Sequence, residues 1–209
     1  MVIIKEMPYQ EKYSNVLDSF KRIDKYVPAF IREHLGEQEV IELQKIRQEG
    51  MNIIPEDASF EEKYELSYGN LISEFQSIIN IVRERLGEDG IERFKRDDVK
   101  SLKQDNDSPA MVILGLIRAF SKGLAFSMTA KTFAYKLQWL SPYSVSELSR
   151  HRLIFDMPRC KVLDFEGGED FCLIGCQSIY PMWFAEQFHV DMKAKREGNS
   201  CRITVSPLR

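Results

Sequence analysis

Apolar residues recur at helical spacing through the N-terminal part of the chain, residues 1–144. Between residues 15 and 48 they occupy every third or fourth position, which predicts helical pieces broken at Pro28 and Gly36. Residues 1–14 lack this pattern, so we expect them to form a loosely ordered lead-in.

A second helix is predicted from the capping box of Ser59 and Glu62, in which each side chain can bond the backbone amide of the other residue. The periodic apolar residues that follow stop at Gly87, a residue type that favours helix termination. We expect a short helix around residues 91–94 and then a polar loop.

Residues 108–109, a serine and a proline, favour the start of a third helix, predicted over residues 109–139. The stretch 109–128 is the most apolar of the chain. Because Arg118 and Lys122 interrupt it, we predict a buried helix and not a membrane span. Small residues alternate there with bulky ones, which permits close approach of another helix, a second copy of the chain or a ligand. The small residues are Gly115, Ala119, Gly123 and Ala125.

The pattern changes in the C-terminal part, residues 145–209, where short β-prone runs flank one helix. The sequence therefore predicts an α+β fold, in which a helical N-terminal part packs on a small β–α–β–β unit as one continuous domain. The predicted elements are strand runs at 152–155 and 161–163, a helix over 172–188 that Pro181 interrupts or restarts, strands at 189–195 and 202–205, and a turn at 197–200.

The balance of charges excludes one class of partner. The chain has 29 Lys and Arg residues against 32 Asp and Glu, so its formal net charge is −3. Without a surplus of positive charge, we expect no nucleic-acid partner. The N-terminus shows no secretory signal and no membrane span is predicted, so we expect a cytoplasmic protein with no membrane partner.

All four cysteines lie in the C-terminal part, which makes it the candidate location for chemistry. Cys172 and Cys176 are about one helical turn apart, and Cys160 and Cys201 approach them from flanking segments. Thiols stay reduced in the cytoplasm, so four of them predict a zinc or iron–sulfur site. Two alternatives stay open: the thiols are buried apolar residues, or Cys172 or Cys176 is a nucleophile near a helix N-terminus.

The three histidines are candidate ligands or bases. His189 follows the cysteine-bearing helix and His151 precedes the first predicted strand, so either can serve a thiol as base or a metal as nitrogen ligand. His34 lies on a polar helix and is expected to face solvent.

Aromatic residues of two predicted helices are candidates for the wall of an apolar pocket. One helix is that over residues 109–139, and the other is the cysteine-bearing helix. Ordinary core packing is the alternative. The candidate ligand-binding residues are Phe126, Phe133, Tyr180, Trp183 and Phe184.

The last part of the chain resembles two protein families. The stretches 172–176, 184–190 and 197–205 are similar to the end of the vinyl-reductase-like domain, which has a cysteine-bearing helix, a strand, a glycine turn and a last strand that opens with Cys. They also look like the tail of the aminothiazoline-carboxylate hydrolase-like family. The first resemblance implies a small-molecule-binding domain for hydrophobic ligands, with cysteines that bind metal in some members. The matching positions are Cys172, Cys176, Gly198 and Cys201.

Three functions follow as expectations. The first is a small-molecule-binding protein that holds an apolar ligand between the helix over 109–139 and the C-terminal unit, with the cysteines binding metal or lining the pocket. The second is a hydrolase of a small heterocycle or amide with a cysteine nucleophile, so whether the chain is an enzyme stays open. The third is an adaptor whose helices form a homodimer, and the small residues favour a homodimer in any case.

Overall fold

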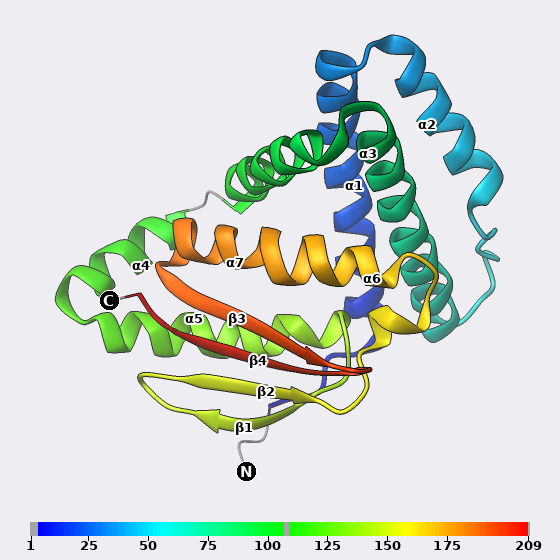
Figure 1. The fold of residues 1–209 in the computed structure, drawn as a ribbon. Coiled ribbons are helices and arrows are strands. Elements are labelled where there is room, and N and C mark those ends of the chain that lie inside the picture. Colours follow the sequence, from blue (N-terminus) through cyan, green and yellow to red (C-terminus); the bar gives the residue numbers. More distant parts are fainter. Residues whose placement is uncertain (1–3, 107–108, 209) are drawn as a thin grey trace.

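The computed structural model describes residues 4–106 and 109–208. It confirms the predicted α+β class, because helices dominate the chain and a four-stranded antiparallel sheet lies in the C-terminal part (Figure 1). The larger helices are α1 (Tyr9–His34), α2 (Glu37–Gly50), α3 (Phe60–Asn106), α4 (Pro109–Phe120) and α5 (Lys122–Lys136). A 3-10 turn η1 (Leu137–Trp139) follows, and later come η2 (Lys161–Asp164), α6 (Gly168–Asp170), η3 (Phe171–Ile179), α7 (Tyr180–Trp183) and η4 (Phe184–Phe188). The strands are β1 (Ser144–Leu148), β2 (Leu153–Met157), β3 (Val190–Glu197) and β4 (Ser200–Pro207).

Helix α1 begins earlier than predicted and is not broken at Pro28. It begins at Tyr9, so the prediction of a loose lead-in is wrong for residues 9–14. It also continues through Pro28, because the apolar residues on either side, Val27 and Phe30, are buried against the other helices. Gly36 does break the chain before α2, with a φ of 112° that favours glycine.

Helix α3 starts at the predicted capping box and bends at the predicted stop. The Ser59 amide donates to the Glu62 carboxylate at 2.9 Å, and the Glu62 amide donates to the Ser59 hydroxyl at 3.2 Å. Gly87 has a φ of 66°, which ends one helical segment, but a second segment then continues to Asn106 and is far longer than the short helix that we predicted. The two segments fold back on each other and on α1 (Figure 1).

The predicted single helix over residues 109–139 is wrong, because two helices form a hairpin in its place. Ser121 is extended, with a φ of −154°, and its hydroxyl accepts a hydrogen bond from the Leu124 amide at 3.3 Å. It therefore caps α5 and ends α4 inside an apolar run. The predicted cap Ser108 lies outside the described residues. We call α4 and α5 together the α4–α5 hairpin.

The sheet has the strand order β1-β2-β4-β3, and all pairs are antiparallel. Strand β1 was not predicted, so the C-terminal unit is β–β–α–β–β. The predicted strand run at 161–163 is wrong: the Cys160 amide donates to the Asn199 carbonyl at 2.7 Å and the Lys161 amide donates to the Ser141 hydroxyl at 3.0 Å, which turns the chain into η2. The predicted hairpin turn is present between β3 and β4, with Gly198 at a φ of 60°.

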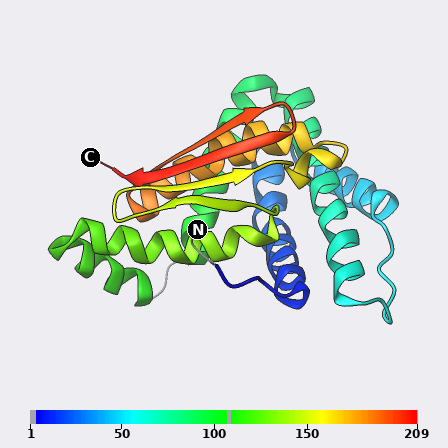
Figure 2. The same ribbon diagram turned by 90° about the horizontal axis from the view of Figure 1, so that it is seen from below.

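One face of the sheet packs on helices and the other lies open (Figure 2). The buried residues of β2 and β4 point to α5 and to the helical stretch from α6 to η4, and the ring of Phe155 packs edge-on against Phe133 at 5.5 Å. The same apolar core continues to the N-terminal helices, where the Tyr68 hydroxyl donates to the Leu140 carbonyl at 2.5 Å. None of the helices in the described ranges is long and apolar enough to cross a membrane.

Candidate functional site

A cleft of about 410 Å³ lies between the α4–α5 hairpin and the corner where η4 passes into β3. This volume is in the range of small-molecule sites, about 300–1,000 Å³. The cleft therefore lies between the two regions from which the sequence analysis draws a ligand site. The hairpin lines it with Gly115, Arg118, Ala119, Lys122, Ala125 and Phe126. The opposite side consists of Phe188, His189, Val190, Pro207 and Leu208.

The small residues of the hairpin are the reason that the cleft is open. A Cβ atom added at Gly115 would meet no heavy atom within 4 Å, so this position borders empty space. Ala119 and Ala125 continue the same wall, while Phe126 is buried and forms its apolar base. Larger side chains at these positions would fill the volume that a ligand needs.

His189 forms the corner opposite the hairpin. It is the one residue other than glycine with a positive φ in the described ranges, 55°, and its carbonyl accepts a hydrogen bond from the Leu208 amide at 3.0 Å. This left-handed conformation is uncommon for a side-chain-bearing residue and turns the chain sharply from η4 into β3. Burial, followed by the nearby positive charge of Arg118, lowers the pKa of the His189 imidazole. The ring is therefore neutral near pH 7.

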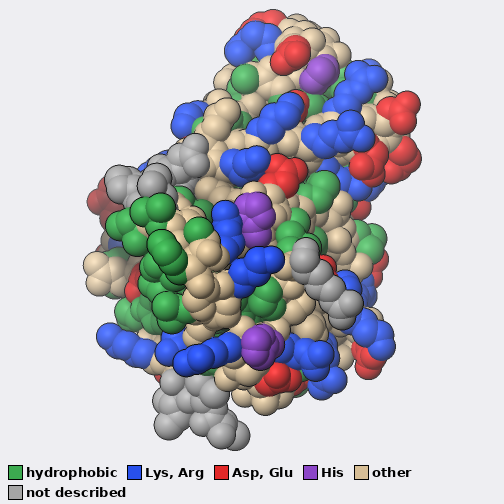
Figure 3. All heavy atoms as spheres, turned by 90° about the vertical axis from the view of Figure 1, so that its left-hand side faces the viewer, with side chains coloured by type: hydrophobic (Ala, Val, Ile, Leu, Met, Phe, Trp, Pro, Cys, Tyr) green, Lys and Arg blue, Asp and Glu red, His purple; other side chains and the backbone are tan. Residues whose placement is uncertain are grey.

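The charges of the cleft have one sign. Arg118 and Lys122 are its charged lining residues besides the titratable His189, and none of the Asp and Glu residues that the structure describes lines it. Within residues 4–106 and 109–208 neither cation forms an ion pair. Figure 3 shows Lys, Arg and His side chains, with scattered Asp and Glu, beside a group of hydrophobic side chains on this side of the molecule. An anion with an apolar body would complement such a lining.

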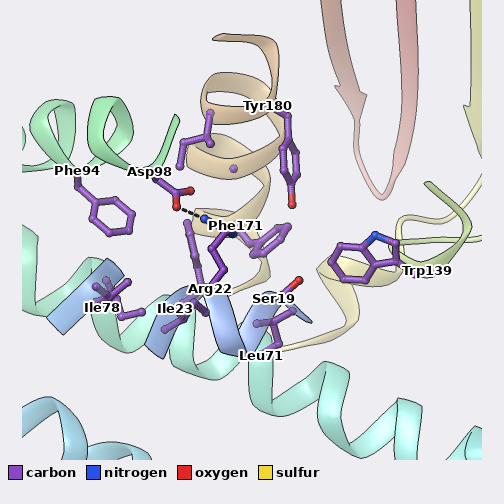
Figure 4. A pocket seen from close by; sticks show the side chains of 14 residues that line it. Ser19, Arg22, Ile23, Leu71, Ile78, Phe94, Asp98, Trp139, Phe171 and Tyr180 are labelled. Carbon is purple, nitrogen blue, oxygen red and sulfur yellow. Dashed lines mark hydrogen bonds and ion pairs between the residues drawn. The ribbon is translucent and has the colours of Figure 1, made fainter. Parts of the chain in front are cut away.

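A second, smaller cavity lies among α1, α3 and the helical stretch that carries the cysteines (Figure 4). Its volume of about 30 Å³ has room for about two water molecules. It differs from the cleft in holding an ion pair: Arg22 donates through Nη1 to the Asp98 carboxylate and, at 3.3 Å, to the Ser101 hydroxyl. Phe171 and Tyr180 close the cavity from the side of the cysteine-bearing helix.

The structure divides the five predicted ligand-binding aromatics among three places. Phe126 lines the cleft, and Tyr180 lines the Arg22 cavity. Phe133 and Phe184 pack edge-on in the core, with ring centroids 4.4 Å apart. Trp183 packs on Phe184 and donates through Nε1 to Gln187. Phe133, Trp183 and Phe184 thus take the alternative role, core packing, and line neither cavity.

The four cysteines lie near one another at the end of the sheet opposite to the cleft. All are free thiols; Cys160, Cys172 and Cys176 are buried, and Cys201 is half-buried on β4. Burial raises the pKa of Cys160 and of Cys176, and raises that of Cys201 to about 12, with further contributions from neighbouring thiols. These three thiols therefore stay protonated at neutral pH and are poor nucleophiles.

The described residues include no group of three or more His, Cys, Asp and Glu side chains placed to hold a metal ion. The thiols thus do not fit a zinc or iron–sulfur site in the arrangement seen here, and that site stays a prediction. The Cys172 sulfur instead accepts a hydrogen bond from the Gln177 side chain at 3.3 Å.

The other two histidines do not join the cleft. His151 is exposed in the β1–β2 loop, where its amide donates to the Ser149 hydroxyl at 3.2 Å. His34 packs against the Phe30 ring at 4.6 Å near the end of α1. No hydrogen bond joins a histidine to a cysteine in the part of the chain that the structure describes.

The sequence analysis missed the two cations as site residues, because Arg118 and Lys122 served there only as arguments against a membrane span. The sequence does contain a signal for these two cations, because residues 108–146 contain no Asp or Glu although 32 of the 209 residues are acidic. Arg118 and Lys122 therefore have no acidic neighbour along the chain with which to pair. Comparison of the chain with protein-family models and with curated proteins finds no match.

Proposed function

We propose that the protein binds a small amphipathic anion, an apolar chain or ring with a carboxylate or similar acidic head, in the cleft beside the α4–α5 hairpin. The observation that carries the proposal is that Arg118 and Lys122, which form no ion pair within the described ranges, lie at the edge of a cleft of about 410 Å³ whose other lining residues, apart from His189, are apolar. This ligand retains the predicted apolar body and adds a charge.

Each part of the lining has a role in this proposal. The guanidinium of Arg118 offers two parallel donors to a carboxylate, and the ammonium of Lys122 adds a second positive charge. The neutral His189 ring can donate one hydrogen bond to the same head group. The apolar body lies along Ala119, Ala125 and Phe126, where burial of its surface stabilises the complex.

The cysteines support the predicted hydrolase less well than the cleft supports ligand binding. The predicted nucleophile is Cys172 or Cys176, such a hydrolase needs a thiolate, and burial keeps the Cys176 thiol protonated. A soft-metal site at the cysteines is tested by elemental analysis of protein purified without added metal. About one zinc per chain that is lost in Cys172→Ser would support such a site, and metal-free protein would contradict it.

Ligands that differ only in the head group test the proposal most simply. The cleft is filled with anilinonaphthalene sulfonate, an anionic fluorophore, and octanoate, octanol and octylamine are used as competitors. We expect octanoate to displace the fluorophore at a concentration at least about tenfold below that of octanol, because a charge-assisted hydrogen bond contributes about 1.5–3 kcal/mol. Octylamine, which brings a third positive charge to the cleft, is expected to be the weakest.

Two variants with matched controls locate the binding site. Gly115→Leu places a larger apolar side chain in the cleft, and Gly50→Leu is its control, because a Cβ at either glycine meets nothing within 4 Å. Arg118→Gln removes one cation, and Arg152→Gln, on the exposed β1–β2 loop, is its control. Loss of octanoate binding in Gly115→Leu and a loss of about tenfold in Arg118→Gln would support the proposal. Equal octanoate affinity in these variants and their controls would refute it.

A further inference from the structure

The outer face of the α4–α5 hairpin, turned away from the cleft, is unusually apolar. We define it by Ile113, Leu116, Phe120, Leu124 and Met128, whose exposed fractions lie between 46% and 91%. They are five of the ten exposed large hydrophobic residues in the described ranges, although the hairpin is a small part of the chain. The prediction of a buried helix is therefore wrong for this face of α4.

Helix geometry separates this outer face from the cleft. Ile113, Leu116 and Phe120 follow the spacing of one face of α4, whereas Gly115, Arg118 and Ala119 lie on the opposite face. Figure 3 shows hydrophobic side chains gathered side by side on this side of the molecule. Contiguous exposed apolar surface of this kind marks an interaction site more often than a single exposed residue does.

The cations of the hairpin and its surroundings indicate what covers the outer face. Lys131 follows Leu124 and Met128 along one face of α5, and the backbone and Cβ of Arg150 lie against Gly123 at the turn of the hairpin. Like Arg118 and Lys122, neither forms an ion pair within residues 4–106 and 109–208. The segment 108–146 contains no acidic residue, so the charges that the hairpin itself brings to its outer face are positive.

We propose that the outer face docks on the surface of a bilayer that contains anionic phospholipids, with Phe120 inserted among the acyl chains. An amphipathic helix with basic residues beside its apolar face lies in the plane of the membrane–water interface. Both the burial of its apolar face and the attraction of its basic residues to anionic lipids add to its affinity. A second copy of the chain fits less well, because a two-fold interface would place the unpaired cations of one hairpin near those of the other. This docking departs from the expectation of no membrane partner, which was drawn from the lack of a spanning helix and a secretory signal. Helix α4, with 12 residues, lies flat in this arrangement.

Flotation of the full chain with vesicles tests the docking. We expect the chain to float with vesicles of phosphatidylcholine and phosphatidylserine in a two-to-one ratio, but not with phosphatidylcholine alone, and to be released by high salt. Phe120→Ser should reduce the bound fraction at least about tenfold. Its control is Ile53→Ser, because Ile53 is 90% exposed but lies in the loop after α2. Lys131→Glu should weaken binding, and Lys21→Glu, on α1, should not.

Two outcomes would overturn the docking. One is equal flotation of Phe120→Ser and Ile53→Ser, or no flotation with anionic vesicles. The other is a dimer in gel filtration that Phe120→Ser converts to a monomer, which would make the face a contact between copies. Phe120→Trp gives a second readout, an emission shift to shorter wavelength when anionic vesicles are added. Gly115→Leu fills only the cleft and should leave flotation unchanged, so failure of the cleft proposal is distinguishable from failure of this one.

Discussion

Arg22 lines a small cavity and Arg118 lines the cleft, but only Arg22 has an acidic partner within the described ranges. Arg22 donates to Asp98 in a cavity of about 30 Å³, so its charge is neutralised within the fold. Arg118 lines a cleft of about 410 Å³ with Lys122 and has no acidic partner within the described ranges. The difference separates a charge that stabilises the structure from a charge that is available to a ligand.

The same contrast distinguishes the segments that carry the two arginines. Helices α1 to α3 are rich in ion pairs, including those of Arg22, Lys25 and Arg47, and acidic residues alternate there with basic ones. In the α4–α5 hairpin, Lys136 pairs with Glu11 of α1, while Arg118, Lys122 and Lys131 have no ion pair in the described part of the chain. The hairpin thus combines unpaired charge with exposed apolar surface, which is typical of a binding region.

Removal of the partner of Arg22 should have the largest effect. Asp98→Asn would leave the mostly buried guanidinium without its counter-charge, so we expect a loss of about 3–5 kcal/mol in the free energy of unfolding. Asp97→Asn, at the adjacent and more exposed position, is the control and should lose less than about 1 kcal/mol. Chemical denaturation measures both, and equal stability of the two variants would show that the Arg22 ion pair is not structural.

A third arginine, Arg47, has a buried partner whose pKa is shifted. The Arg47 Nε lies 3.3 Å from a carboxylate oxygen of Glu74, and burial raises the pKa of Glu74 to about 7 from 4.5. The folded state therefore holds this proton more tightly than the unfolded chain. The stabilising effect of this raised pKa is fully present below pH 4.5 and declines as the pH rises toward 7. It is absent at higher pH.

Glu74→Gln should remove that pH dependence. The amide stays neutral, so the variant should lack the decline of about 3 kcal/mol that wild type shows between pH 4.5 and pH 8. The difference in the free energy of unfolding between the two proteins should therefore change by about that amount over this range, apart from the loss of the Arg47 ion pair. Denaturant titrations at several pH values measure this. A difference between the two proteins that does not change with pH would contradict the assigned pKa.

A carboxylate placed in the cleft should make it resemble the Arg22 cavity. Lys122→Glu would give Arg118 an acidic neighbour and repel an anionic ligand, so we expect octanoate affinity to fall about thirtyfold or more. Octanol, which is neutral, should bind with nearly unchanged affinity. If both ligands lose affinity equally, the variant has altered the shape of the cleft, and charge recognition is not supported.

The smallest effect is expected for Arg118 itself. Because it forms no ion pair in the described ranges, Arg118→Gln should change the free energy of unfolding by less than about 0.5 kcal/mol while it weakens octanoate binding. A stability loss similar to that of Asp98→Asn would remove the distinction between the two arginines.

The sequence predicted the location of the cleft better than its chemistry. Small residues at Gly115, Ala119 and Ala125 predicted the close approach of another helix, a second copy of the chain or a ligand, and these residues line the cleft. The break at Ser121 was missed because a serine inside an apolar run does not by itself end a helix. The aromatic candidates were separated because residues on one helix face different neighbours, as Tyr180 and Phe184 do.

The cysteines show what spacing along the sequence does not indicate, which is the direction in which each side chain points. Their nearness is real, since Cys160, Cys172 and Cys201 each affect the ionisation of Cys176. Whether near thiols can ligate a metal depends on the direction of their side chains, which follows from the π-helical winding of η3 and the turn into η2. Neither feature has a sequence signal that we used.

A crystal structure with terminally brominated octanoate tests the central claim most directly, because anomalous scattering locates the bromine. The account predicts one ligand in the cleft, with its carboxylate between Arg118 and Lys122 and its bromine toward Phe126. A ligand beside Arg22, or one that lies only on the outer face of the hairpin, would contradict the assignment of the cleft as the anion-binding site.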